Sequence, residues 1–198
     1  MAAVPLVGVL ALQGDVDEHC RMLESRGAQA LRVKTAADLA RVDGLIVPGG
    51  ESTTVIRLLD RFEMTDPLIA RVRAGMPFWG TCMGMIVAAH DVAGIEQKTL
   101  GLLDVTVLRN AFGRQLASEE VPLDIPALGP EPFPAVFIRA PWIERSGPGV
   151  EVLATHKGHG VFVRQGSVMG TSFHPELTGD ARVHDYFLHL LTANAKAA

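Results

Sequence analysis

The sequence predicts an α/β protein with a three-layer, doubly wound architecture, in which a mostly parallel central sheet carries helices on both faces. Two observations lead to this fold class. From residue 6 to residue 94, short apolar runs alternate with segments of helical periodicity, as expected for buried parallel strands and their crossover helices. After Gly101 short strand-like segments follow one another between turn residues, which predicts antiparallel strands in the C-terminal half.

The first half of the chain has helix boundaries that can be identified from single residues. Gly27 is suited to a helix C-cap, Thr35 opens a Thr-x-x-Asp helix start, and Pro67 follows an aspartate as in many first turns. The predicted strands are residues 6–12, 28–33, 43–47 and 76–80, and the predicted helices are residues 15–27, 35–40, 52–62, 66–75 and 83–94.

The second half consists of predicted strands and one terminal helix. The strands are residues 102–110, 121–125, 134–140, 150–156, 160–165 and 168–173. Residues 180–195 carry an apolar stripe at helical spacing, and the proline-rich residues 125–135 are expected at the surface. The chain has no repeats and no linker-like segment, so we expect a single domain over residues 1–198.

Composition narrows the class of function. The 198 residues are 48% hydrophobic with a formal net charge of −4, and no run of lysine or arginine exceeds two residues. This balance argues against nucleic acid or a membrane as partner, and the first apolar run is too short to span a bilayer. The two cysteines, Cys20 and Cys82, do not resemble a secreted disulfide framework, so we expect a cytoplasmic protein.

The segment from Gly80 to Gly84 has the Gly-x-Cys-x-Gly spacing of a nucleophile elbow. Such a turn projects the side chain of Cys82 from the carboxyl end of the sheet, and the start of the following helix favours a thiolate. The backbone N–H of Met83 is expected to stabilise an oxyanion. The alternative is a small core residue, the role we expect for Cys20 on its apolar helix face.

A base for this nucleophile is available in "SFHPE". His174 can take the thiol proton, and Glu176 can hold the imidazole in the required tautomer. A lone His-Pro-Glu turn is usually structural, but together with the elbow it predicts a Cys-His-Glu site. "PGGEST" follows a predicted strand and can present backbone amides to an anionic atom, although a glycine pair also fits an ordinary tight turn.

The motifs "PGGEST", "GTCMG" and "SFHPE" together resemble the class I (triad) glutamine amidotransferases. The resemblance implies hydrolysis of glutamine to glutamate and ammonia through a cysteinyl thioester. It also implies that Cys82 is the nucleophile, His174 the general base and acid, and Glu176 the residue that orients it. No metal and no cofactor is expected.

Blocks of sequence between Gly8 and Asp180 are similar to one branch of that family, the glutaminase subunits of pyridoxal 5′-phosphate synthase. The similarity implies L-glutamine as substrate and a barrel-type pyridoxal 5′-phosphate synthase subunit as partner. The residues it implies for glutamine binding are Gly50, Glu51, Ser52, Arg109, Ile138 and Arg139. We further hypothesise that the Gly49–Gly50 peptide reorients when the partner docks and completes, with Met83, the oxyanion hole.

Other interpretations stay open at this point. The chain could serve another synthase, such as the one that forms the imidazole ring in histidine synthesis, or be a catalytically silent assembly subunit. His19 falls within the resemblance but has no role that its chemistry assigns, and Arg114 is not placed in the site. His184 and His189, on the last predicted helix, are expected to be surface or packing residues.

Overall fold

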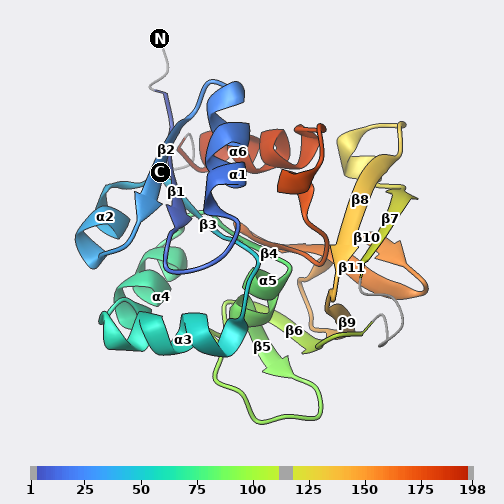
Figure 1. Cartoon of the computed structure of the whole chain (residues 1–198), viewed down its shortest axis with the longest axis horizontal. Coiled ribbons are helices and arrows are strands. Elements are labelled where there is room, and N and C mark those ends of the chain that lie inside the picture. The colour runs from blue at the N-terminus through green and yellow to red at the C-terminus, as the bar shows by residue number, and fades with distance from the viewer. Residues whose placement is uncertain (1–3, 112–117, 196–198) are drawn as a thin grey trace.

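The computed structural model describes residues 4–111 and 118–195, which form one large sheet, a two-stranded sheet and the surrounding helices (Figure 1). The strands are β1 (Leu6–Leu10), β2 (Gln29–Val33), β3 (Gly44–Val47), β4 (Phe78–Thr81), β5 (Ala89–Val92), β6 (Leu103–Leu108), β7 (Ser118–Leu123), β8 (Phe133–Ile138), β9 (Trp142–Ser146), β10 (Glu151–His156), β11 (His159–Gln165) and β12 (Val168–Thr171). The helices are α1 (Val16–Ser25), α2 (Ala36–Arg41), α3 (Ser52–Arg61), α4 (Thr65–Arg73), α5 (Met83–Ala88) and α6 (Arg182–Ala195), with short 3₁₀ turns η1 (Pro126–Leu128) and η2 (Pro175–Leu177).

The large sheet has the strand order β2-β1-β3-β4-β12-β11-β9-β6-β5, and β10 pairs with β11 off this path. From β2 to β12 all neighbours are parallel, and β5 is parallel to β6. The strands around β11 and β9 are antiparallel, as are β7 and β8 in the small sheet. The predicted fold class, a doubly wound parallel sheet with antiparallel strands added from the C-terminal half, is therefore confirmed.

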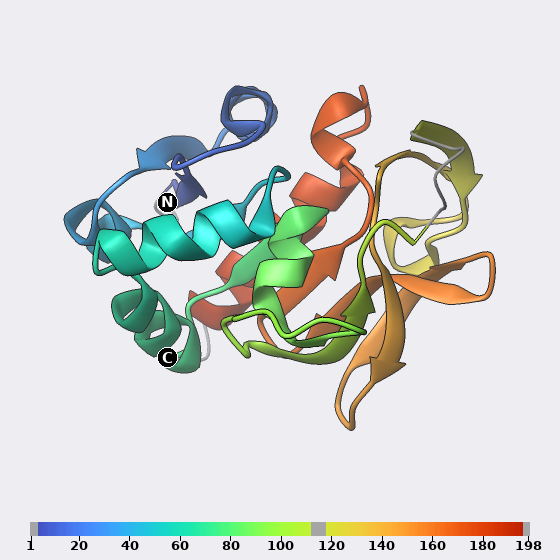
Figure 2. The same ribbon diagram turned by 60° about the horizontal axis from the view of Figure 1, so that its bottom comes forward.

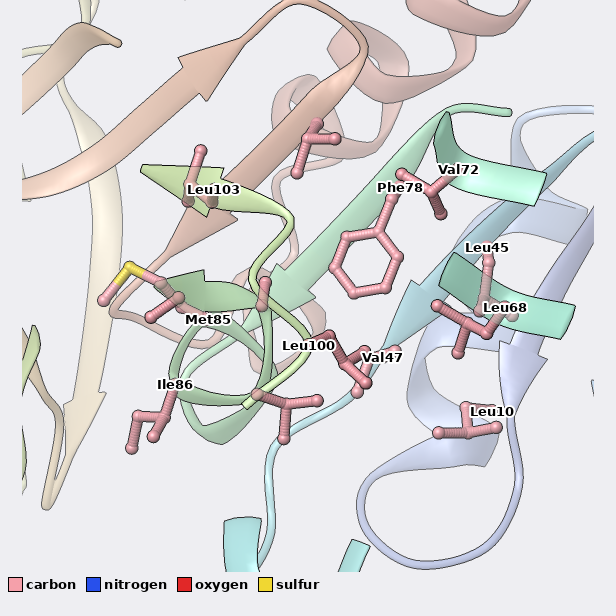
Figure 3. Close-up of a cluster of buried hydrophobic side chains, with 14 of the residues drawn as sticks. Leu10, Leu45, Val47, Leu68, Val72, Phe78, Met85, Ile86, Leu100 and Leu103 are labelled. Atoms are coloured by element: carbon pink, nitrogen blue, oxygen red, sulfur yellow. The ribbon is translucent and has the colours of Figure 1, made fainter. Parts of the chain in front are cut away.

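Alternate residues of the parallel strands belong to two separate core layers. The helices that cover the sheet, α1 and α6 on one face and α3, α4 and α5 on the other, can be followed in Figures 1 and 2. We call the layer beneath α2, α3, α4 and α5 the apolar layer; its members include Leu45, Leu68 and Phe78 (Figure 3). The layer against α1, α6 and the β7–β8 sheet, which includes Trp79 and Phe187, is called the histidine layer because His19 and His184 are buried beside the Trp79 ring. The single-residue alternation is the reason that Phe78 and Trp79 enter different layers.

One predicted helix is wrong in its second half. Residues 83–94 were expected to be helical, but α5 ends at Ala88 and residues 89–92 form β5. The carbonyl oxygens of Val87 and Ala88 accept hydrogen bonds from the N–H groups of Leu100 and Leu102 instead of continuing the helix. Because residues 83–89 are buried throughout, their apolar pattern does not distinguish a helix from a buried strand.

Strand β9 was missed by the sequence pattern, since "WIERS" has only one buried residue, Ile143. It pairs antiparallel with β6 and meets β11 at a single position, and so extends the sheet beyond its parallel half. None of the described helices combines the length and the hydrophobicity that a membrane span requires.

Candidate active site

Cys82 occupies the sharp turn between β4 and α5, where its backbone adopts φ 48° and ψ −106°. Positive φ is uncommon for a residue with a side chain and marks local strain. Both flanking glycines are required by close packing. A Cβ on Gly84 would lie 2.0 Å from the Val47 carbonyl oxygen, and one on Gly80 would lie 2.3 Å from the backbone of Gly84. The helix therefore rests directly on β3 and β4, as the elbow spacing predicts.

Neighbouring strand ends bring the other reactive residues to this turn. The N–H of Cys82 donates to the carbonyl oxygen of Thr171 at the end of β12, 2.7 Å away, and His174 follows three residues later. The N–H of His174 donates to the Val136 carbonyl oxygen of β8 at 2.8 Å, which fixes the loop that carries the imidazole. The Cys82 thiol lies 3.8 Å from the carbonyl oxygen of Ile138, also on β8.

His174 and Glu176 form a buried hydrogen-bonded pair with 2.7 Å between Nδ1 and Oε1. Burial alone lowers the pKa of His174, but hydrogen bonds and charge interactions with Cys82 and Glu176 outweigh burial and raise this pKa to about 10. His174 is therefore an imidazolium at neutral pH in this arrangement. A protonated imidazole beside the sulfur stabilises a thiolate.

The loop after β3 lies against the same imidazole. A Cβ on Gly49 would lie 2.5 Å from Cε1 of His174, so any larger residue would displace the ring. Gly50 has φ 149° and lies against Gln13, whose side-chain oxygen accepts the Glu51 N–H at 3.0 Å. Two glycines in succession therefore let the loop pass closely between the imidazole and the Gln13 side chain.

Beside Cys82 is a pocket of about 130 Å³. It is lined by Gly50, Glu51, Ser52, Cys82, Met83, Ile86, Arg109, Asn110, Ile138, Arg139 and Pro141. All six residues that the resemblance implies for glutamine binding are in this lining. Of the other predicted residues, Met83 also lines it, whereas Gly49, His174 and Glu176 are not among the lining residues.

Charged and amide groups are paired within the pocket. Arg109 donates to Glu51 Oε1 and to the Gln97 side-chain oxygen, both at 2.8 Å, and the Gln97 amide donates to the Ser52 hydroxyl at 3.0 Å. Hydrogen bonds from the Thr53 hydroxyl, the Thr54 N–H and Arg109 lower the pKa of Glu51. The pocket thus presents an ionised carboxylate and two guanidinium groups, those of Arg109 and Arg139, which suits a zwitterionic ligand.

Comparison with known proteins identifies the family. The family model of the SNO glutamine amidotransferases matches residues 9–193. The chain belongs to the SNO glutamine amidotransferase family. It is 52% identical to the pyridoxal 5′-phosphate synthase subunit PdxT of Kosmotoga olearia, covering 92% of this chain and 95% of that protein. It is 54% identical to the PdxT subunit of Mycobacteroides abscessus, covering 96% and 98%.

A solved structure supports the same assignment. The crystal structure of a glutamine amidotransferase superposes with a TM-score of 0.89 at 48% identity, covering 94% of this chain and 98% of that one. The predicted resemblance to glutamine amidotransferases, and to the branch that serves pyridoxal 5′-phosphate synthase, is confirmed at the level of the family.

Several residues around the site carried no sequence signal of their own. Gln97 lies in a loop far from any motif, and only its hydrogen bonds to Ser52 and Arg109 identify it. Gln13 belongs to a block of the family resemblance, but its contact with Gly50 depends on how β1 and β3 pair. Arg114 lies outside the described residues.

One group of three possible metal ligands occurs among the residues that the structure describes: Asp15, His174 and Glu176. Its geometry is explained without an ion. The Nδ1 atom of His174 is already engaged by Glu176 at 2.7 Å, and Asp15 is a half-exposed carboxylate 3.7 Å from the same nitrogen. Asp15 therefore adds negative charge beside the ring, and we assign no metal site here.

Proposed function

We propose that this protein is the glutaminase subunit of a pyridoxal 5′-phosphate synthase: it hydrolyses L-glutamine to L-glutamate and ammonia and delivers the ammonia to a partner synthase subunit. The observation that carries the proposal is the convergence of Cys82, His174 and Glu176 beside a pocket with paired acidic and basic groups. The name shared by the close relatives supports the choice of synthase over the one that forms the imidazole ring. Intact nucleophile, base and carboxylate argue against a silent assembly subunit.

The first half of the reaction forms a thioester. The Cys82 thiolate attacks the side-chain amide carbon of glutamine, and the carbonyl electron pair moves onto the oxygen. His174 then donates its proton to the amide nitrogen as the carbon–nitrogen bond breaks, so that ammonia leaves and a γ-glutamyl thioester remains on Cys82. The raised pKa of His174 keeps this proton available at neutral pH.

The second half regenerates the enzyme. Neutral His174 takes a proton from water, the resulting hydroxide attacks the thioester carbon, and the sulfur leaves as thiolate while glutamate is released. Glu176 holds Nδ1 of His174 throughout, so that the other ring nitrogen faces the reacting atoms. Its charge also stabilises the imidazolium that each half of the reaction requires.

The oxyanion formed in each half needs hydrogen-bond donors. We propose the N–H of Met83, at the start of α5, together with the Gly49–Gly50 peptide. The Gly49 carbonyl oxygen lies against the backbone of Gly14, where a Cβ would approach it to 1.8 Å. Rotation of this peptide on docking of the partner would turn an N–H toward Cys82, and glycine on both sides makes the rotation inexpensive.

Glutamine binding is assigned to the pocket lining. The α-carboxylate and α-ammonium groups of the substrate are complementary to the guanidinium groups and to the Glu51 carboxylate. We place the protein in the cytoplasm, since both cysteines are free thiols and the nucleophile must remain reduced.

A glutaminase assay with and without the barrel synthase tests the proposal. We expect glutamate release to increase on addition of the synthase, and pyridoxal 5′-phosphate to form when the pentose and triose phosphates are also supplied. Equal glutaminase rates with and without the synthase would contradict the gating by the Gly49–Gly50 peptide. Absence of glutamate release in the complex would contradict the proposed function itself.

A further inference from the structure

Two histidines that the proposed mechanism does not use are fully buried behind the catalytic pair. His19 comes from α1 and His184 from α6, and both are 0% exposed. Their rings lie 5.1 Å apart between centroids and both pack on Trp79, at 5.4 and 4.8 Å. Polar rings in a core layer lose hydration and must be matched by hydrogen bonds or used for function.

The contacts of His19 lead directly to the active site. Its Nδ1 atom lies 3.0 Å from Nε2 of His184. On the other side its Nε2 atom lies 3.3 Å from the hydroxyl of Thr81, the residue before the nucleophile, and 3.5 Å from Oε2 of Glu176. Within the described residues that oxygen is buried and has no hydrogen-bond partner within normal distance. His19 therefore faces the second oxygen of the carboxylate whose first oxygen holds His174.

One unpaired nitrogen determines the tautomers along this row of side chains. His184 Nδ1 is buried without a partner among the described residues. Buried N–H groups without an acceptor are rarer than buried acceptors without a donor, so we assign the proton of His184 to Nε2. That N–H donates to Nδ1 of His19, and the proton of His19 is then on Nε2, directed at Glu176 and Thr81.

Both histidines are neutral in this environment. Burial, followed by the proximity of His184 and His174, lowers the pKa of His19 well below its ordinary value, and burial lowers the pKa of His184 to about 3. A neutral donor is what the site requires. An additional imidazolium beside Glu176 would compete with His174 for the carboxylate charge, whereas a neutral N–H holds the carboxylate without neutralising it.

We propose that His19 is a positioning residue of the active site, whose Nε2–H fixes the rotation of the Glu176 carboxylate so that Oε1 stays on His174. This inference rests on the proposed function and extends it from three residues to four. Through Thr81, His19 also links the carboxylate to the end of β4, immediately before Cys82. Without His19 the carboxylate is free to turn, and the orientation of His174 is lost for part of the time.

Three substitutions at His19 separate positioning from packing. Glutamine can place an amide N–H near the position of Nε2, asparagine reaches only the position of Nδ1 toward His184, and leucine removes both hydrogen bonds. With the synthase present we expect His19→Asn and His19→Leu to lower kcat about 10- to 100-fold with little change in KM. A decrease of this size corresponds to the loss of one hydrogen bond to a charged group. His19→Gln is expected to stay within about threefold of the wild-type kcat. Cys20→Ala, next in the same helix and buried in the same layer, is the control and should keep the wild-type kcat.

A substrate-independent readout distinguishes failure of this inference from failure of the proposed function. The rate of alkylation of Cys82 by iodoacetamide, located by mass spectrometry, reports the thiolate that His174 stabilises. For each variant, the alkylation rate at neutral pH is divided by the limiting rate at alkaline pH. We expect this ratio to be several-fold lower than in the wild type for His19→Asn and His19→Leu, but not for His19→Gln. The assignment would be overturned if His19→Asn kept the wild-type kcat and the wild-type alkylation rate. It would also be overturned if His19→Gln and His19→Asn were both folded and lost the same amount of activity.

The wild-type protein provides a test that does not depend on the variants folding. Imidazole nitrogen chemical shifts measured by NMR should show His19 as the neutral tautomer with its proton on Nε2 and its Nδ1 bare. The opposite tautomer, with the proton on Nδ1, would direct a lone pair at Glu176 and would overturn the proposal.

Discussion

The apolar layer and the histidine layer lie on opposite faces of the same strands, yet they bury different chemistry. The apolar layer, beneath α2 to α5, is filled by aliphatic side chains, Phe78 and methionines (Figure 3). The histidine layer holds two imidazoles, and Glu176 is buried at its edge beside α1. Buried polar groups of this kind seldom add stability by comparison with apolar ones. Both layers consist of buried apolar side chains that stabilise the fold, but the histidine layer also buries polar groups beside the active site, at some cost in stability.

The largest effect, a loss of activity, is expected from a substitution at the edge of the histidine layer. Glu176→Gln keeps the shape of the side chain but removes the charge that stabilises the His174 imidazolium, so the pKa of His174 falls. Neutralising the equivalent carboxylate in a serine triad costs about 10⁴ in kcat, and we expect a loss of about 10³- to 10⁴-fold here. Steady-state glutaminase assays of the complex measure it. A loss of less than tenfold would show that Glu176 does not orient the base.

A substitution in the apolar layer should have the opposite result, a loss of stability without a loss of activity. Leu68 is fully buried on α4, away from the pocket. We expect Leu68→Ala to lower the free energy of unfolding by about 2–5 kcal/mol because it leaves a cavity. The activity per folded molecule should not change. Urea denaturation measures the free energy of unfolding, and a glutaminase assay at a temperature where the variant is folded measures its activity. A large fall in kcat would remove the proposed division between the layers.

A third effect is that the buried His184 makes the free energy of unfolding depend on pH. The folded-state pKa of His184 is about 3, below the ordinary value of 6.5, so the unfolded chain binds a proton that the folded chain does not. Stability from neutral His184 is present above pH 6.5 and is lost as the pH falls toward 3, by about 1.4 kcal/mol per pH unit.

His184→Phe should remove that part of the acid limb of a plot of unfolding free energy against pH. Phe187→Leu, one turn further along the same buried face, is the control, since it should lower stability by a similar amount at every pH. An unchanged acid limb in His184→Phe would mean that His184 is not held neutral by burial.

The smallest effect concerns the loop after β3, which lies against the imidazole of His174. Gly49→Ala places a methyl group against Cε1 of His174, and we expect kcat to fall about tenfold as the ring is displaced. Gly179→Ala is the control, since nothing lies within 4 Å of its added carbon. Equal kcat values in the two variants would show that the imidazole has room to move without loss of function.

The sequence predicts those parts of the site that depend on local turn chemistry. Gly80, Cys82 and Gly84 define the elbow because a strand must turn at once into a helix that rests on its neighbours. The parallel half of the sheet was likewise predictable, since its buried strands alternate with capped helices. The pairing of strands that are far apart in the sequence could not be predicted. Residues 89–92 form a strand only because β6 lies beside them, which no local pattern reveals.

The supporting side chains were unpredictable for the same reason. Gln97 and His19 contact residues that are 45 and 62 positions away in the chain, Ser52 and Thr81 respectively. Their own neighbourhoods carry no signal of this. His184 was expected to be either a surface or a packing residue, and the structure shows that it packs inside the histidine layer.

The central claim is that Cys82 carries the γ-glutamyl group during turnover. Acid-quenching the complex during glutamine hydrolysis, followed by proteolysis and mass spectrometry, tests it directly. The account predicts a glutamyl adduct on the peptide that contains Cys82, none on the peptide that contains Cys20, and no glutamate release in Cys82→Ala. Glutamine hydrolysis at the wild-type rate in Cys82→Ala, with the synthase present, would contradict it.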